Sequence, residues 1–334
     1  MHMSDALITP IVGGTMLASS GGVVGYSIKK IKVDVYEKRL PLMAVMGAFL
    51  FAAQMINFAI PGTGSSGHIG GGMLLAIILG PFASFLTMAC VLLIQALFFA
   101  DGGLLALGCN LINLGFFTGF IAYPFIYKPL TRTKVNPSKI MIASILAAVV
   151  GLQLGSLAVV VETVLSGRTE LSFASFLMFM QPIHLAIGIV EGIITGVVVN
   201  YIYSQNTNMI YAHSDMESNN QRSGKNRFRV IVTLVMVTVI VGSGISLFAS
   251  SSPDGLEWAI EKTTTEEITS DSTLASWLQS IQDRVAFMPD YQLKGNNNEY
   301  LGTSLSGFVG SGLTLLAALS ILFLIRKKRA KVNE

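Results

Sequence analysis

A glycine- and serine-rich stretch interrupts the apolar part of the chain, and it reads Pro61-Gly62-Thr63-Gly64-Ser65-Ser66-Gly67-His68. The apolar run that follows, 69–80, is too short to cross a bilayer comfortably, because a spanning helix needs about 20 mostly apolar residues. A helix of half that depth implies that the preceding loop dips into the membrane region. Non-helical backbone is tolerated there only when protein surrounds it or when it lines a cavity. The stretch therefore predicts a loop that lowers His68 into the protein.

Composition places the rest of the chain in the membrane. Hydrophobic residues make up 52% of the 334 and charged residues 12%, whereas soluble domains carry about 25% charged residues. Apolar runs long enough to span lie at 6–28, 41–60, 82–99, 104–127, 139–162, 177–203, 229–249 and 305–325. We expect an all-α integral membrane protein, a polytopic helical bundle with a short half-depth helix after a dipping loop, plus a two-helix C-terminal module.

The distribution of lysine and arginine predicts the orientation in the cell membrane. Suppose that the eight long runs and the short run 69–80 all cross, which makes nine crossings, and that the N-terminus is extracytoplasmic. Then 18 of the 22 basic residues fall on the cytoplasmic side, as does the C-terminus. Met1, His2 and His68 then share the outer face. The net charge of +3 is too small to indicate nucleic acid as a partner, so the lipid bilayer is the expected environment.

The first two residues form a chelating unit. The α-amine of Met1, the amide nitrogen of His2 and its imidazole can wrap a divalent metal in two fused rings, and His68 can supply a fourth nitrogen. Flat nitrogen sites favour Ni(II) or Cu(II). The alternatives are that His2 is a disordered terminal residue and that His68 only forms a local hydrogen bond. Because the amide and amine must lose protons, capture by this chelate would depend on pH.

Two ionisable residues share one predicted helix, 177–203. His184 and Glu191 are seven residues apart and so project from nearly the same side. Charged groups at membrane depth are costly and usually functional. The simpler interpretations are that His184 is neutral and bonded to a carbonyl, and that Glu191 ties two helices together; both could also lie in a second shell around a metal. The same helix carries glycines at 188, 192 and 196, a spacing that predicts close helix packing.

The chain divides into four parts. We expect a metal-capture transmembrane domain at 1–204, a cytoplasmic linker at 205–228, an accessory module at 229–325 and a basic cytoplasmic tail at 326–334. The accessory module has an extracytoplasmic segment, 250–304, with nine acidic and three basic residues. That acidity can concentrate cations near an entrance, or it can be ordinary solubilising charge. His213, in the linker, is interpreted as a solvated bystander.

Motifs that would indicate an enzyme are missing. The sequence contains no GxxxxGK[ST] phosphate loop, no HExxH zinc motif and no GxSxG elbow. An intramembrane enzyme is therefore disfavoured, and no cofactor is expected. If the protein drives transport uphill, partner subunits must hydrolyse the ATP.

Six motifs occur in order along the chain: Met1 to Asp5, Phe51 to Phe58, Pro61 to His68, Phe99 to Gly108, Pro182 to Gly188, and Pro253-Asp254-Gly255-Leu256-Glu257. The first five resemble the substrate-specific membrane subunit of nickel and cobalt energy-coupling-factor transporters, the NikM/CbiM group. The match covers roughly 1–204. A second, shorter resemblance is to the accessory component of NikN or CbiN type, over about 229–325. The motif from Pro253 to Glu257 carries this second resemblance.

The resemblance implies import of Ni(II) or Co(II), with a transmembrane coupling subunit and cytoplasmic ATPase subunits as partners. It implies metal ligation by Met1, His2 and His68, with Gln54 and Asn57 beside the site as possible orienting residues. We expect Ni(II); the alternatives are Co(II), in cobalt uptake for cobalamin synthesis, and a membrane metal sensor that transports nothing.

Overall fold

The computed structural model describes residues 2–31, 40–133, 135–167, 172–211, 223–262, 272–294 and 299–330. Among these, seven helical stretches are long and apolar enough to cross a membrane, which confirms the expected all-α polytopic fold. Their elements are α1(Pro10–Lys30), α5(Pro81–Phe99), the continuous run α6(Leu107–Leu111), η2(Ile112–Tyr127) and α7(Lys128–Thr131), α8(Pro137–Ser166), α9(Phe173–Gln205), α10(Ser223–Ser243) with η5(Ile245–Phe248), and α13(Glu299–Ala330). Short 3₁₀ turns η1(Asp5–Leu7) and η3(Thr207–Met209) precede α1 and follow α9.

The predicted dipping loop is present. Helix α3(Leu40–Gln54) ends before the expected residue 60, and the chain turns into a hairpin of β1(Phe58–Ile60) and β2(Ser65–Gly67). The half-depth helix is α4(Gly72–Leu79), every residue of which is buried. The expectation of one spanning helix over 41–60 was therefore wrong, because the last residues of this run pair as a strand.

Two glycines bracket α4 and allow the chain to reverse at each of its ends. Gly71 has φ of 71° and Gly80 has φ of 84°, a region that residues with a Cβ rarely adopt. A Cβ on Gly71 would also lie 2.0 Å from Cδ1 of Leu50. Pro81 then starts α5, a position where its missing N–H costs nothing.

Helices α8 and α9 pack against each other along a glycine face. A Cβ on Gly192 would lie 2.4 Å from the Cα of Ile145, and added Cβ atoms on Gly188 and Gly196 would come within 2.9 and 2.5 Å of α8. The predicted packing role of these three glycines is thus confirmed. This face holds α9, which carries His184 and Glu191, tightly against its neighbour.

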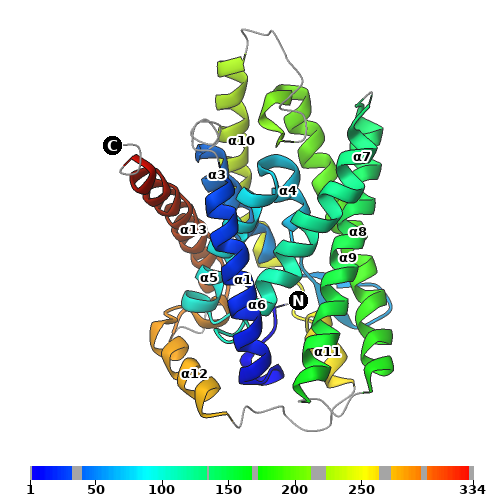
Figure 1. Cartoon of the computed structure of the whole chain (residues 1–334), viewed down its shortest axis with the longest axis vertical. Coiled ribbons are helices and arrows are strands. Elements are labelled where there is room, and N and C mark those ends of the chain that lie inside the picture. The colour runs from blue at the N-terminus through cyan, green and yellow to red at the C-terminus, as the bar shows by residue number, and fades with distance from the viewer. Residues whose placement is uncertain are drawn as a thin grey trace.

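The C-terminal elements cover one side and one end of the bundle. Helices α10 and α13 pack against α3, and between them lie α11(Gly255–Glu261), α12(Thr273–Val285) and η6(Pro289–Tyr291). In Figure 1, α11 and α12 lie at the lower end, whereas α7, the start of α10 and the end of α13 lie at the upper end. The basic residues at the ends of these elements therefore gather opposite α11 and α12.

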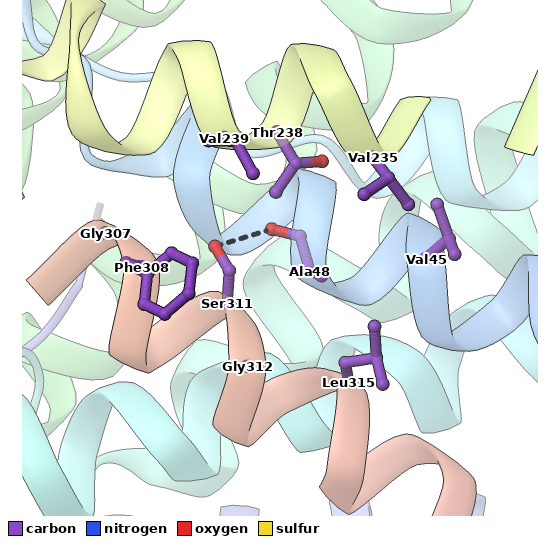
Figure 2. A pocket seen from close by; sticks show the side chains of 10 residues that line it. All are labelled: Val45, Ala48, Val235, Thr238, Val239, Gly307, Phe308, Ser311, Gly312 and Leu315. Atoms are coloured by element: carbon purple, nitrogen blue, oxygen red, sulfur yellow. Dashed lines mark hydrogen bonds between the residues drawn. The ribbon is translucent and has the colours of Figure 1, made fainter. Parts of the chain in front are cut away.

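A cavity of about 190 Å³ lies among α3, α10 and α13. Figure 2 shows its lining, which is almost wholly apolar, and the hydrogen bond that Ser311 Oγ donates to the carbonyl of Ala48 at 3.2 Å. Neither His2 nor His68 lines it. The cavity is thus a gap between the helices of the two halves and lies apart from the histidines.

Candidate metal-capture site

The segment just after the first residue is fixed by the loop that follows α5. Asn110 accepts from the backbone N–H of Met3 at 2.8 Å and donates to the carbonyl of Met3 at 3.2 Å. The same carbonyl accepts from the N–H of Gly103 at 2.9 Å, and Asp5 Oδ1 accepts from the N–H of Ala106, also at 2.9 Å. Backbone groups on both sides of residue 3 are satisfied, so His2 is held in one place.

His68 is held by the loop that dips between the hairpin and α4. Gln54 donates to the carbonyl of Gly70 at 2.8 Å, and Glu191 accepts from the N–H of Gly70 at 2.7 Å. The imidazole Nδ1 of His68 lies 3.1 Å from the carbonyl of Ile69. When Nδ1 donates to that carbonyl, Nε2 carries the lone pair that can bind a metal.

The two imidazoles meet. The rings of His2 and His68 lie with centroids 4.9 Å apart and planes 16° from parallel, and each side chain is 7% exposed. The Nε2 atom of His2 is buried without a hydrogen-bond partner in the described structure. Met1, the third predicted ligand residue, lies outside the described residues.

Side chains alone do not complete a metal site here. In the part of the chain that the structure describes, no group of three His, Cys, Asp or Glu side chains converges as metal ligands. Two imidazoles are half of a four-nitrogen set. A metal held between them therefore needs further donors, and backbone nitrogens beside His2 are the nearest chemical source.

Two carboxylates flank the histidines, and sequence reasoning did not place either at the site. Asp101 Oδ1 lies 3.4 Å from Nδ1 of His2, and Asp254 Oδ2 lies 3.9 Å from Nε2 of His68. In the sequence, Asp101 belongs to the motif from Phe99 to Gly108, and Asp254 belongs to the PDGLE motif and the acidic segment. A signal for Asp101 was available, because the charge count places it in a four-residue outer loop between two spanning runs.

The environment keeps both histidines neutral. Burial lowers the pKa of His2 to about 3 and is the main cause that lowers the pKa of His68 to about 4. Burial also raises the pKa of Asp101, partly offset by a hydrogen bond from Tyr291. Burial acts to raise the pKa of Asp254 too, but nearby positive charge and the hydrogen bond from the N–H of Leu256 hold it below its ordinary value. A neutral imidazole at pH 7 has a nitrogen lone pair that can bind a metal.

Asp254 reaches the site because its segment is fastened to the hairpin. The N–H of Ser66 donates to the carbonyl of Pro253 at 2.7 Å, and its Oγ donates to the carbonyl of Ser252 at 2.7 Å. Ser66 and Asp254 form a parallel bridge. Asp254 also caps α11, since Oδ1 accepts from the N–H of Leu256 at 2.5 Å. The hairpin thus holds the backbone around Asp254, and the N-terminus of α11 orients its side chain.

The three remaining predicted residues have different surroundings. Gln54 supports the dipping loop and accepts from Gln95 at 3.0 Å. Asn57 accepts through its backbone carbonyl from the N–H of Ser250 at 2.7 Å, and its side-chain oxygen is buried without a partner in the described structure. His184 Nδ1 lies 2.7 Å from the carbonyl of Met180, one turn back on α9. The carbonyl-bonded interpretation of His184 thus fits its geometry.

This arrangement defines a class of protein: a multi-pass membrane protein with a buried pair of neutral histidines flanked by carboxylates. Residues 2–209 match the family model described as cobalt uptake substrate-specific transmembrane region, CbiM, and residues 228–327 match the PDGLE domain. The chain belongs to the CbiM family and carries a PDGLE domain in the same polypeptide. It is a substrate-specific component of a metal transporter.

Relatives and solved structures agree with this assignment. A protein of Archaeoglobus fulgidus that carries the name fused nickel transport protein NikMN is 33% identical over 94% of this chain and 96% of its own. The fused nickel transport protein NikMN of Rhodobacter capsulatus is 33% identical over 48% of this chain and 46% of its own. A crystal structure of a truncated transition metal transporter superposes with a TM-score of 0.54 at 33% identity, covering 61% of this chain and 99% of that one.

Proposed function

We propose that this protein captures Ni(II) at the outer face of the cell membrane and passes it inward as the substrate-binding subunit of an ATP-driven importer. The observation that carries the proposal is the contact between the imidazoles of His2 and His68, whose ring centroids lie 4.9 Å apart. Relatives fused in the same way are named nickel transport proteins.

The proposed ligands are four nitrogens. Met1 supplies its amine, His2 its amide and imidazole Nδ1, and His68 its Nε2. A flat set of this kind suits Ni(II), and Cu(II) binds such nitrogens at least as tightly by the usual affinity order. Co(II) is the rival cargo, since other members of the family are named cobalt transport proteins. Choice among the three ions would then depend on geometry and on availability outside the cell.

Energy would come from partners. No phosphate-binding loop occurs in the sequence, so cytoplasmic ATPase subunits, joined through a transmembrane coupling subunit, would drive release of the ion. Release follows when these partners shift the helices that hold the hairpin and the segment after Met1. The basic ends of α7, α10 and α13 would face the cytoplasm in this arrangement.

Calorimetric titration of the purified full chain with Ni(II) tests the chelate. We expect His2→Ala and His68→Ala each to weaken binding by about 100-fold or more, because each removes a ligand atom. Three residues inserted between Met1 and His2 keep both imidazoles but separate the amine from His2, and should have a similar effect. His213→Ala, in the predicted linker, is the matched histidine control. Unchanged affinity in the insertion variant would refute the role of the amine.

Uptake of radioactive nickel by cells separates transport from sensing. We expect accumulation only when this chain is expressed with the coupling subunit and both ATPases, and loss of accumulation in His2→Ala. Tight binding by the purified protein together with no uptake under any combination of partners would favour a sensor. Competition with excess Co(II) in the same assay ranks the two cargoes.

A further inference from the structure

The C-terminal module reaches the histidine pair at two separate points. Asp254, in the segment before α11, lies beside His68, and Tyr291, in η6, donates a hydrogen bond to Asp101 Oδ2. The other oxygen of Asp101 lies 3.4 Å from Nδ1 of His2. The module thus approaches one imidazole directly and the other through a carboxylate from the loop after α5.

Tyr291 is held firmly in this position. Its ring stacks on Phe99 with centroids 5.2 Å apart and planes 22° from parallel, and its hydroxyl accepts from Gln95 at 3.4 Å. Its backbone has φ of 60°, a conformation that is unfavourable for a bulky residue and persists only where the surroundings enforce it. Ser306 on α13 fixes the carbonyl of Tyr291 at 2.9 Å.

Each carboxylate lies beside the nitrogen that the proposed chelate would use. Asp101 faces Nδ1 of His2, which closes the second chelate ring, and Asp254 faces Nε2 of His68. A divalent ion bound to one deprotonated amide and three neutral nitrogens retains one positive charge. Burying a net charge is costly unless an opposite charge is near. Negative charge on the carboxyl groups at these places offsets that cost.

We propose that the C-terminal module completes the capture site electrostatically: Asp254 serves with Asp101 as a charge partner of the bound ion, and Tyr291 is a positioning residue that aims Asp101 at His2. The proposal rests on the proposed function, since it assumes an ion held by His2 and His68. It gives the module a defined part in binding, in addition to any part in assembly with partners.

Titration of the purified full chain with Ni(II) tests both residues through conservative changes. Asp254→Asn keeps an N-cap for α11 and removes the charge, and Tyr291→Phe keeps the ring on Phe99 and removes the hydroxyl. We expect each to weaken Ni(II) binding by about 10- to 100-fold, the usual effect of losing a partner of a metal ligand, and to shift the absorption bands of bound Ni(II). The matched controls are Asp283→Asn and Tyr300→Phe, both exposed, which should bind as the unaltered protein does.

Double variants show whether the effects run through the stated partners. Asp254→Asn should add little in a His68→Ala background, and Tyr291→Phe should add little in an Asp101→Asn background, because coupled residues are not additive. Full additivity in either pair overturns the corresponding role. A folding defect alone would lower the melting temperature of the metal-free variant. It would not explain a shift in the absorption bands of bound Ni(II), nor the non-additive affinities of the double variants.

The outcomes separate this inference from the function it rests on. If His2→Ala abolishes binding while Asp254→Asn and Tyr291→Phe bind normally, the charge and positioning roles are wrong and the chelate stands. If His2→Ala binds normally, the chelate itself is wrong and the inference fails with it.

Discussion

Gly103 is a residue whose lack of a side chain supports the histidine site. A Cβ there would lie 1.8 Å from Oδ1 and 2.5 Å from the backbone nitrogen of Asp5. We expect Gly103→Ala to push residues 3–5 away from the loop after α5 and so displace His2. Ni(II) affinity, measured by calorimetry, should fall by about tenfold or more, as expected for a loss of 1.4 kcal/mol or more.

The matched control for Gly103→Ala is Gly14→Ala, because an added Cβ at Gly14 meets nothing within 4 Å. Alanine at that helical position should leave Ni(II) binding unaltered and slightly favour the helix. Equal affinities of the two variants would contradict the proposed dependence of His2 on its backbone anchors.

At this scale, sequence could identify the two histidines but not their carboxylate neighbours. His2 and His68 stand out because imidazoles are rare in the chain and because the charge count places both on one face. Asp254 lies far from His68 in the sequence. The contact between their side chains depends on how the backbone of Ser66 pairs with Pro253. Such long-range pairing leaves no trace in local residue patterns.

Among elements, α9 helps to hold the dipping loop through one carboxylate, in addition to the contact of Gln54 with the same loop. Glu191 accepts from the N–H of Gly70, and removing that acceptor leaves a buried donor unsatisfied at a cost of about 1–3 kcal/mol. We expect Glu191→Ala to loosen the loop and lower Ni(II) affinity about tenfold, measured by titration. Glu191→Gln keeps an acceptor and should recover most of the affinity; Glu261→Ala, at an exposed position, is the control. Native affinity in Glu191→Ala would show that the loop is held by other contacts.

The glycine face between α8 and α9 gives a second prediction about elements. We expect Gly192→Ala to destabilise the protein by about 1–3 kcal/mol, because the new methyl group would overlap the backbone of α8 at Ile145. The measurement is the melting temperature in detergent, compared with Gly21→Ala, where added atoms meet open space. A melting temperature equal to that of the control would mean that α8 and α9 can accommodate the added methyl group without loss of stability.

The elements themselves were largely predictable because apolar length determines them. The half-depth helix α4 was expected from a run too short to span, and it is present at Gly72–Leu79. The end of α3 at Gln54 was missed, since residues 55–60 are as apolar as the helix before them. Only the pairing of Phe58–Ile60 with Ser65–Gly67 makes the end of this run a strand.

For the whole molecule, the two halves pack side by side, and both place residues around the histidine pair. Helices α10 and α13 pack on α3, and the segment between them reaches both the hairpin and the loop after α5. The sequence divided the chain into a capture domain and an accessory module, and residues 212–222 of the linker, with His213, lie outside the described residues. What sequence could not give is the docking of the acidic segment, because that depends on contacts between residues nearly 190 positions apart.

The orientation of the whole molecule in the membrane is testable with cysteines. Both native cysteines, Cys90 and Cys109, are buried, so they should remain unreactive in folded protein. We expect Lys262→Cys, at the end of α11, to react with a membrane-impermeant maleimide in intact cells, and Arg132→Cys, after α7, to react only after the membrane is opened. Both positions are exposed, so access depends on the side of the membrane alone. Labelling of Arg132→Cys in intact cells would show that the bundle has the opposite orientation. The histidine pair would then face the cytoplasm, which is the wrong side for import.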